Sequence, residues 1–315
     1  MTSSIHRRLI SATIGMLIAA HALAYDEPQV NLGLTSYLDG APPAGPGLYV
    51  EEYVQYYTSD RLNDNNGNKL PLPGQKVDVA SSVTQFLYLA PTKFLGGHPG
   101  FDLLLPAVLG HSIDDGLGNA VLKGQNGIGD VIFGPLLQFG PYVGPGGPVF
   151  SHRFELDISA PTGAYNRNNA VNPGSNFWSI NPYWAATYWI TPKMTASVRF
   201  HYLWNSRNND PNASFGPGVT STQAGQALHA NVAIEYTFTP KFRLGVNAYW
   251  FNQISDTKVN GGNVAGRRER VWAIGPGMLY SFSNDDYLFL NAYFEQGARN
   301  RSEGNRFVAR YVHHF

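Results

Sequence analysis

Charged side chains recur at every second position in two short stretches of this sequence. Arg153, Glu155 and Asp157 alternate with other residues in FSHRFELDIS, and Arg199 and His201 do so in MTASVRFHYLWN. Residues two apart in an extended strand point to the same face of a sheet. The spacing therefore predicts a wall that carries charges of both signs, opposite an apolar wall. Charged side chains arranged in this way can select solutes in a narrow channel.

Further residues are expected on the same charged wall. They lie at polar positions of other predicted strands: Asp102, Asp130, Glu235 and Arg243. The complete set allows a second interpretation, in which the charges form ion pairs that brace the interior of a filled barrel. The two interpretations are compatible, and both remain open from the sequence.

Ester hydrolysis is the alternative chemistry that these residue types allow. A nucleophilic serine needs an adjacent base and an acid that orients the base. Ser197, His201 and Glu235 could supply these groups. However, no G-x-S-x-G signature supports a hydrolase. We therefore expect that the protein is not an enzyme.

No cofactor or metal site is expected from the sequence. The absence of Cys excludes thiolate metal sites, redox dithiols and disulfides. His313 and His314 are adjacent, so in a strand they point to opposite faces and do not chelate one ion. Four acidic residues in expected loops could bind calcium or bridge lipopolysaccharide, but they lack EF-hand spacing, which favours solvated turns: Asp60, Asp64, Asp114 and Asp115.

The composition is typical of a chain built from many short strands. Charged residues make up 14 % of the sequence, whereas about 25 % is usual. Aromatic residues, which favour strands, make up 13 %, and 34 Gly and 21 Pro can form the turns. The formal net charge is zero and no basic run occurs, which argues against nucleic acid as a partner.

The N-terminus has the three parts of a secretory signal peptide. Arg7 and Arg8 precede an uncharged apolar run, which ends in the small-residue motif ALA at 22–24. We expect cleavage after Ala24, so that the mature chain begins at Tyr25. No later run of about 18 apolar residues could form a transmembrane helix. An exported chain that is rich in aromatic residues and lacks such helices predicts a β-barrel in the bacterial outer membrane.

Period-two alternation predicts an all-β protein, a transmembrane antiparallel up-and-down barrel of about twelve strands. The connections alternate between long segments and short ones such as TPK at 191–193 and 239–241, as in outer-membrane barrels. An even strand number returns both ends of the chain to the periplasmic side. The predicted strands are 47–58, 76–90, 101–112, 128–140, 149–160, 177–190, 193–205, 223–238, 241–253, 270–282, 286–297 and 305–315.

The chain thus divides into a signal peptide (1–24), an N-terminal segment (25–46) and a barrel (47–315). The N-terminal segment shows no periodicity, so it could form a periplasmic tail or fold into the lumen. Some barrel residues fit the alternation poorly. Glu51 and Glu52 are adjacent, so one faces lipid unless a bulge intervenes, and Gln85 lies on the apolar parity of its strand. We expect bulges or kinks at three prolines inside strands: Pro135, Pro182 and Pro276.

The last strand ends in NRFVARYVHHF and closes the predicted barrel against the first. Phe307, Tyr311 and Phe315 share one parity and are expected to face lipid, whereas Arg306 and Arg310 are expected in the lumen. A terminal Phe with alternating rings resembles the signal that outer-membrane barrels present to the insertion machinery. The expected partners are therefore outer-membrane lipid and lipopolysaccharide, the insertion machinery and a small-molecule solute. We expect a monomer.

Five stretches in order resemble the phenol-degradation meta-pathway family of outer-membrane proteins. They are PGLYVEEYVQYY (46–57), NGIGDVIFGP (126–135), LDISAPTGAY (156–165), GSNFWSINPYWAATYWITPK (174–193) and NRSEG (300–304). The resemblance implies a channel for passive uptake of small, hydrophobic or aromatic solutes, and it carries over no binding residues. The alternatives are a structural or adhesive barrel with a filled lumen, and an outer-membrane hydrolase.

Overall fold

The computed structural model describes residues 27–28, 30–42, 44–119 and 122–315. The expected signal peptide and its cleavage after Ala24 lie outside the described residues. Within the described part of the chain, no helix is long and apolar enough to cross a membrane.

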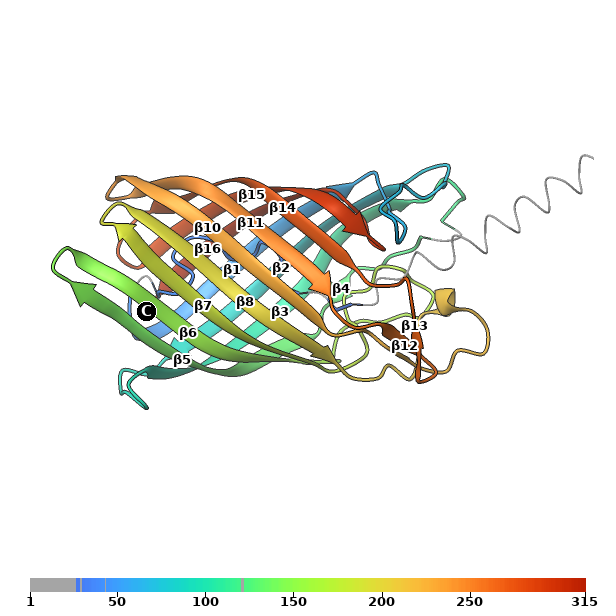
Figure 1. Cartoon of the computed structure of the whole chain (residues 1–315), viewed down its shortest axis with the longest axis horizontal. Coiled ribbons are helices and arrows are strands. Elements are labelled where there is room, and N and C mark those ends of the chain that lie inside the picture. Colours follow the sequence, from blue (N-terminus) through green and yellow to red (C-terminus); the bar gives the residue numbers. More distant parts are fainter. Residues whose placement is uncertain (1–26, 29, 43, 120–121) are drawn as a thin grey trace, which may run out of the picture.

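Twelve long antiparallel strands close into a barrel, as the alternation predicted (Figure 1). Neighbouring strands in the barrel follow one another in the sequence, and β1 pairs with β16 to complete the ring. The strands are β1 (Gly47–Ser59), β2 (Lys76–Leu89), β3 (His98–Asp114), β5 (Val131–Gly144), β6 (Gly147–Ala160), β7 (Ser179–Thr191), β8 (Met194–Asn205), β10 (Ala227–Thr239), β11 (Phe242–Gln253), β14 (Arg270–Ser281), β15 (Asp286–Arg299) and β16 (Asn305–His314).

The two ends of the barrel differ, because long loops extend from one end and short turns from the other (Figure 1). We call them the long-loop end and the short-turn end. The long loops contain four two- or three-residue strands and one 3-10 turn: β4 (Gly127–Ile128), β9 (Thr222–Gln223), β12 (Thr257–Val259), β13 (Gly262–Val264) and η1 (Ala213–Phe215). β9, β12 and β13 form a small separate sheet.

The two faces of each strand follow the predicted parity, as β8 illustrates. Thr195, Ser197 and Arg199 are buried in the lumen, whereas Phe200 is exposed on the outer surface. In β16, Phe307 is likewise exposed outside. The barrel therefore has an outer surface rich in apolar and aromatic side chains, as a barrel in lipid requires.

The residues that fit the sequence alternation poorly nevertheless follow it in the structure. Glu51 and Glu52 follow the alternation without a bulge, since both pair in register with β2. Glu52 faces outward, where the Thr84 hydroxyl donates a hydrogen bond of 2.7 Å to its carboxylate. Gln85 lies on the apolar parity, but this parity faces the lumen in β2, and Gln85 is buried there.

The three prolines inside strands do not produce the expected bulges. Pro182 pairs with β6 and Pro276 pairs with β11, and Pro135 pairs with β3. Each proline-containing strand has a second neighbouring strand. Its pairing with that strand is interrupted at the proline and resumes in the same register. Proline lacks the N–H that a ladder bond needs. At these three positions pairing is lost locally, and the register of the strands does not change.

Candidate functional site

The described part of the N-terminal segment, residues 27–46 without 29 and 43, runs through the barrel lumen. At the long-loop end, Asn205 donates a hydrogen bond of 2.8 Å to Glu27. At the short-turn end, the Tyr49 hydroxyl donates to the Gly45 carbonyl. We call this segment the plug. Glu27 therefore lies at the long-loop end, whereas β1 begins and β16 ends together at the short-turn end, where Tyr49 pairs with His314, as an even strand number predicts.

A chain of about twenty residues can reach from one end of the barrel to the other. An extended chain spans about 3.3 Å per residue, so the plug is longer than a barrel strand of 12 to 14 residues such as β6 or β8. The sequence left the lumen as one of two locations for this segment, and the structure places its described residues there.

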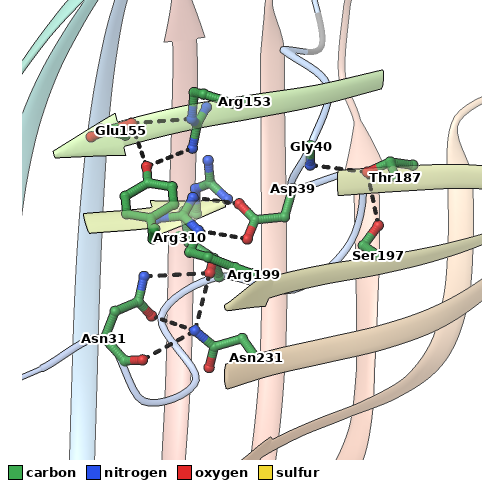
Figure 2. A network of polar contacts seen from close by, with 12 residues as sticks. Asn31, Asp39, Gly40, Arg153, Glu155, Thr187, Ser197, Arg199, Asn231 and Arg310 are labelled. Atoms are coloured by element: carbon green, nitrogen blue, oxygen red, sulfur yellow. Dashed lines mark hydrogen bonds and ion pairs between the residues drawn. The ribbon is translucent and has the colours of Figure 1, made fainter. Parts of the chain in front are cut away.

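Polar side chains of the barrel wall hold the plug at several depths. Asn231 accepts a hydrogen bond of 2.7 Å from the Gly33 N–H and donates one of 3.0 Å to the Asn31 carbonyl. Farther along, the Gly40 N–H donates to the Thr187 hydroxyl at 2.9 Å (Figure 2). The wall thus supplies hydrogen-bond partners for plug backbone groups that are removed from water.

Two glycines allow the plug to approach the wall closely. A Cβ added at Gly40 would lie 2.4 Å from the backbone of Ala186. Gly33 has a φ of +78°, and a Cβ there would lie 2.6 Å from the ring of Tyr293. A larger residue at either position would therefore have to move the plug away from its hydrogen-bond partners.

The plug contributes a carboxylate to a charged layer across the lumen. Arg199 donates from Nε to Asp39 Oδ2 at 2.7 Å, and Figure 2 shows the paired arrangement of the two side chains. This ion pair joins the plug to β8.

Two further ion pairs belong to this charged layer. Arg153 and Glu155 approach to 3.1 Å on β6, and Arg310 on β16 donates to Glu51 at 2.8 Å. The Tyr183 ring lies between the arginines, with the Arg199 guanidinium 4.4 Å from its centroid. Each charge in these pairs has a partner of opposite sign, as buried charges require.

Three of the residues predicted for the charged wall form one carboxylate group. Asp102 on β3 lies beside Glu155 and Asp157 on β6, and one oxygen of each carboxylate lies within 4.8 Å of the other two. Gln85 donates a hydrogen bond of 2.6 Å to Asp102. The sequence placed Asp102 near this wall, but it did not indicate how close the three carboxylates are.

The remaining predicted wall residues serve different structural contacts. His201 stacks on His229 with the ring centroids 4.0 Å apart. Glu235 accepts a hydrogen bond from Thr195 and lies 3.7 Å from Arg243. These residues belong to the lumen wall, and their contacts are with other wall residues.

Asp130 joins the long loop before β5 to the long loop between β6 and β7, and it does so through hydrogen bonds. Its carboxylate accepts hydrogen bonds from the N–H groups of Gly163 at 2.9 Å and Ser175 at 2.8 Å. Thr162, beside Gly163, accepts a hydrogen bond of 3.0 Å from the Val131 N–H. The Gly-Asp, Pro-Thr-Gly and Gly-Ser stretches that the sequence singled out therefore meet at one place. Their role there is to position loops.

The geometry gives the hydrolase alternative no support. Ser197 forms its hydrogen bond with Thr187 at 3.0 Å. His201 is four residues farther along β8, about 13 Å at the usual strand rise, and its Nδ1 contacts Asn181. Glu235 is engaged by Thr195 and Arg243. The nucleophile, base and acid are thus not within hydrogen-bond reach of one another.

A cavity of about 310 Å³ lies between the long loops and the charged layer. Its floor includes the carboxylates of Asp102, Glu155 and Asp157 and the Arg199 side chain. Apolar side chains from both the wall and the plug line much of the rest, and charged residues such as Asp130, Glu269 and Arg301 also belong to the lining. The apolar ones include Leu32, Leu104, Ile132, Phe177, Leu203 and Phe251. A cavity of about 150 Å³ holds a benzene molecule, so this cavity has room for a small aromatic solute.

The short-turn half of the lumen is packed. Tyr37 of the plug is buried against a cluster of apolar side chains from the wall, and the plug residues Leu38 and Ala44 pack on the same cluster. The wall members of this cluster are Tyr49, Leu87, Leu89, Leu136, Ala233, Leu279, Tyr287, Phe289 and Val312. The sequence predicted charged side chains in the lumen and gave no sign of this apolar packing.

The comparisons with known proteins agree with this architecture. The family model described as "Putative MetA-pathway of phenol degradation" matches residues 59–311. No curated protein matches the sequence. Among solved structures, the COG4313 outer membrane channel from Pseudomonas putida F1 superimposes with a TM-score of 0.75 at 19 % identity, over 91 % of this chain and 100 % of that chain.

Two other structures are similar at a lower level. The translocator domain of the autotransporter NalP from Neisseria meningitidis has a TM-score of 0.48 at 11 % identity, covering 86 % of this chain and 89 % of that chain. The TodX deltaS2S3 mutant monoaromatic hydrocarbon channel has a TM-score of 0.47 at 10 % identity, covering 93 % and 98 %. The similarity to the COG4313 channel shows the fold. The two structures with lower TM-scores add no evidence to it.

Proposed function

Because the chain belongs to the family described as the MetA-pathway of phenol degradation, we propose that it is a bacterial outer-membrane channel for passive uptake of small hydrophobic or aromatic solutes. The observation that carries the proposal is the cavity of about 310 Å³, which has apolar walls and lies between the long loops and the charged layer. The long-loop end is the external end of the barrel in this proposal, as in outer-membrane barrels generally.

The cavity walls favour an apolar body and the floor favours a polar group. Leu104, Ile132 and Phe251 offer apolar surface, while Arg199 and Glu155 offer charged hydrogen-bonding groups. A phenol-like solute has this division, with one polar group on an apolar ring. Pockets that combine apolar walls with a few convergent polar groups are typical of small-molecule sites.

Passage through the short-turn half requires the plug to move in this proposal. The described plug residues are held by hydrogen bonds and by the ion pair between Asp39 and Arg199, and none of these residues pairs with a strand of the wall. A local rearrangement of the plug would therefore leave the barrel ladder intact. Such segments of low local stability are the ones that typically move in channels and lids.

The test is uptake of labelled phenol at micromolar supply by cells that have and lack the protein, with bilayer conductance of the purified protein in parallel. We expect slower uptake in the deletion strain. We also expect a higher conductance in the E155A/R199A variant than in the wild type, because two large side chains leave the charged layer. Unchanged uptake together with no conductance in either protein would contradict the proposal.

A structural barrel with a filled lumen is the second candidate, because the packing of Tyr37 and its neighbours closes the short-turn half. The same experiment separates the two functions, since a structural barrel has no conductance in either form. In both cases we propose that the protein is a monomer in the outer membrane. Its terminal strand, with Phe307, Tyr311 and Phe315 on the outer face, would be recognised by the insertion machinery.

A further inference from the structure

The carboxylate group at the cavity floor has the composition of a cation site. Asp102, Glu155 and Asp157 each direct one oxygen to within 4.8 Å of the other two. Asp102 and Glu155 are only 2 % and 4 % exposed, and Asp157 is half-buried. Three negative charges at this separation in a buried place repel one another strongly. Something of positive charge must therefore offset the repulsion.

The neighbouring arginines do not supply enough positive charge. Among the described residues of the charged layer, five carboxylates face three guanidiniums, and each guanidinium is already paired with one carboxylate. The pairs are Arg153 with Glu155, Arg199 with Asp39 and Arg310 with Glu51. Asp102 and Asp157 are the two carboxylates without an ion pair, so the layer carries a formal charge of about −2 when all five are ionised.

The hydrogen bonds of the group leave one oxygen of each carboxylate free. Gln85 donates to one oxygen of Asp102, and Tyr183 donates to one oxygen of Glu155. The other oxygens, Asp102 Oδ1 and Glu155 Oε1, are buried and have no hydrogen-bond partner among the described residues, and the same holds for Asp157 Oδ1. A buried carboxylate oxygen without a partner is costly. The donors on the second oxygens fix the orientation of the side chains.

We propose that Asp102, Glu155 and Asp157 bind one hard divalent cation, with Ca²⁺ as the ion that fits best. Ca²⁺ binds oxygen ligands at about 2.3–2.6 Å, so two ligands on opposite sides of the ion are up to about 5 Å apart. Mg²⁺ binds at about 2.0–2.1 Å, which limits the separation to about 4.2 Å. All three separations lie within 4.8 Å, a range that an ion of the size of Ca²⁺ can bridge.

The cavity completes the site. Ca²⁺ takes six to eight oxygen ligands, and three carboxylates supply three to six of them. All three residues line the cavity of about 310 Å³, from which water can supply the others. The charge of the ion equals the deficit of the charged layer. This site is independent of solute passage, and it holds for a channel and for a filled barrel alike.

Protons shared between the carboxyl groups are the alternative way to offset the repulsion. One bound proton lowers the formal charge of the layer from about −2 to about −1 and two make it neutral, so that no metal ion is needed. The two possibilities differ in a direct measurement, because only the cation site shows saturable binding of added Ca²⁺ at neutral pH.

The experiment uses mature protein refolded in detergent without lipopolysaccharide, treated with EDTA and dialysed. Calorimetric titration with Ca²⁺ is expected to show one ion per chain, with Mg²⁺ binding more weakly. Tb³⁺ is the second probe. Tyr183 hydrogen-bonds to Glu155, so excitation of tyrosine should sensitise Tb³⁺ luminescence, and Ca²⁺ should displace the Tb³⁺.

The test variant is D102N/D157N, which preserves side-chain volume and removes the two unpaired charges. We expect it to lose about 100-fold or more in Ca²⁺ affinity, because affinity depends on the number of charged ligands. D157N alone serves if the double variant does not fold, since Asp157 is the most exposed of the three, and we expect about a tenfold loss. E295Q is the matched control, because Glu295 is a buried lumen carboxylate paired elsewhere, with Tyr249.

Three results would overturn the proposal. The first is a folded wild type that binds neither Ca²⁺ nor Tb³⁺ saturably at neutral pH, which would indicate shared protons. The second is equal affinity in wild type and D157N. The third is an equal loss in E295Q and D157N, which would show that the effect is not specific to the three carboxylates.

Discussion

The two halves of the lumen are built from the same strands, but the plug fills them to different extents. Toward the long-loop end the plug residue Leu32 packs against wall residues such as Leu203 and Phe251, and these side chains also line the cavity. Toward the short-turn end Tyr37 is buried among wall side chains, and Leu279 and Leu89 are each 1 % exposed. The charged layer at Asp39 and Arg199 joins the halves.

The comparison shows that strand alternation fixes which side chains face the lumen but does not fix whether the lumen is open. β8 contributes Arg199 to the charged layer and Leu203 to the cavity. The plug packs against the wall in both halves, but a cavity remains beside it toward the long-loop end. Three ways of changing the plug or its contacts test how it fills the lumen.

Removal of the plug should have the largest effect, which is an increase in conductance. Deletion of residues 27–42 from the mature chain would remove Tyr37, Asp39 and the hydrogen bonds of Gly33 and Gly40. Since the barrel ladder does not include these residues, we expect a folded barrel with a several-fold higher single-channel conductance. Planar bilayer recording measures it, with heat-modified gel mobility as the control for folding. Unchanged conductance of the folded variant would show that the plug does not close the lumen.

Removal of the Asp39 carboxylate should have the next largest effect, which is a loss of unfolding free energy. D39N leaves Arg199 buried without its ionic partner, which costs about 3–5 kcal/mol of unfolding free energy. The matched control is D210N, because Asp210 pairs with Arg167 at 3.0 Å with both side chains about half exposed. The control should lose less than about 1 kcal/mol. Urea unfolding in lipid vesicles gives both values, and equal losses would contradict the importance of burial.

Loss of one hydrogen bond of the plug should have the smallest effect. Y37F keeps the packed ring and removes the hydroxyl that donates to Asn247 at 3.2 Å. We expect a loss of about 1 kcal/mol and little change in conductance, because the ring still fills the short-turn half. Equilibrium unfolding and bilayer recording measure the two quantities. A conductance as high as that of the plug deletion would show that the hydrogen bond, and not the packing, holds the lumen closed.

The strands could be predicted from the sequence because their signal is local. The alternation in β8 separated Ser197 and Arg199 from Phe200 without knowledge of any neighbour. The same reasoning failed at Gln85, since the apolar parity of β2 faces the lumen. A filled lumen offers an apolar environment as lipid does, so hydrophobicity alone did not distinguish the two faces there.

The candidate site could be predicted only in part, because its partners are distant in the sequence. The residues of the charged wall were visible as alternate charges, but Asp39 lies 160 residues from Arg199 in a segment without periodicity. No local pattern indicates that these two residues meet. Similarly, Asp130 had the same sequence signal as Asp102, yet it binds the backbone of Gly163 and Ser175. Hydrogen bonds to backbone groups leave no mark on the sequence of the partner.

Cysteine accessibility in intact cells tests the difference between the two halves most directly, because the chain contains no native Cys. Ser159 lines the cavity, and Leu89 is buried in the short-turn half. An aqueous maleimide added outside the cells should label S159C, and it should label L89C only after residues 27–42 are deleted. Equal labelling of S159C and L89C with the plug present would contradict a lumen that is open at one end and filled at the other.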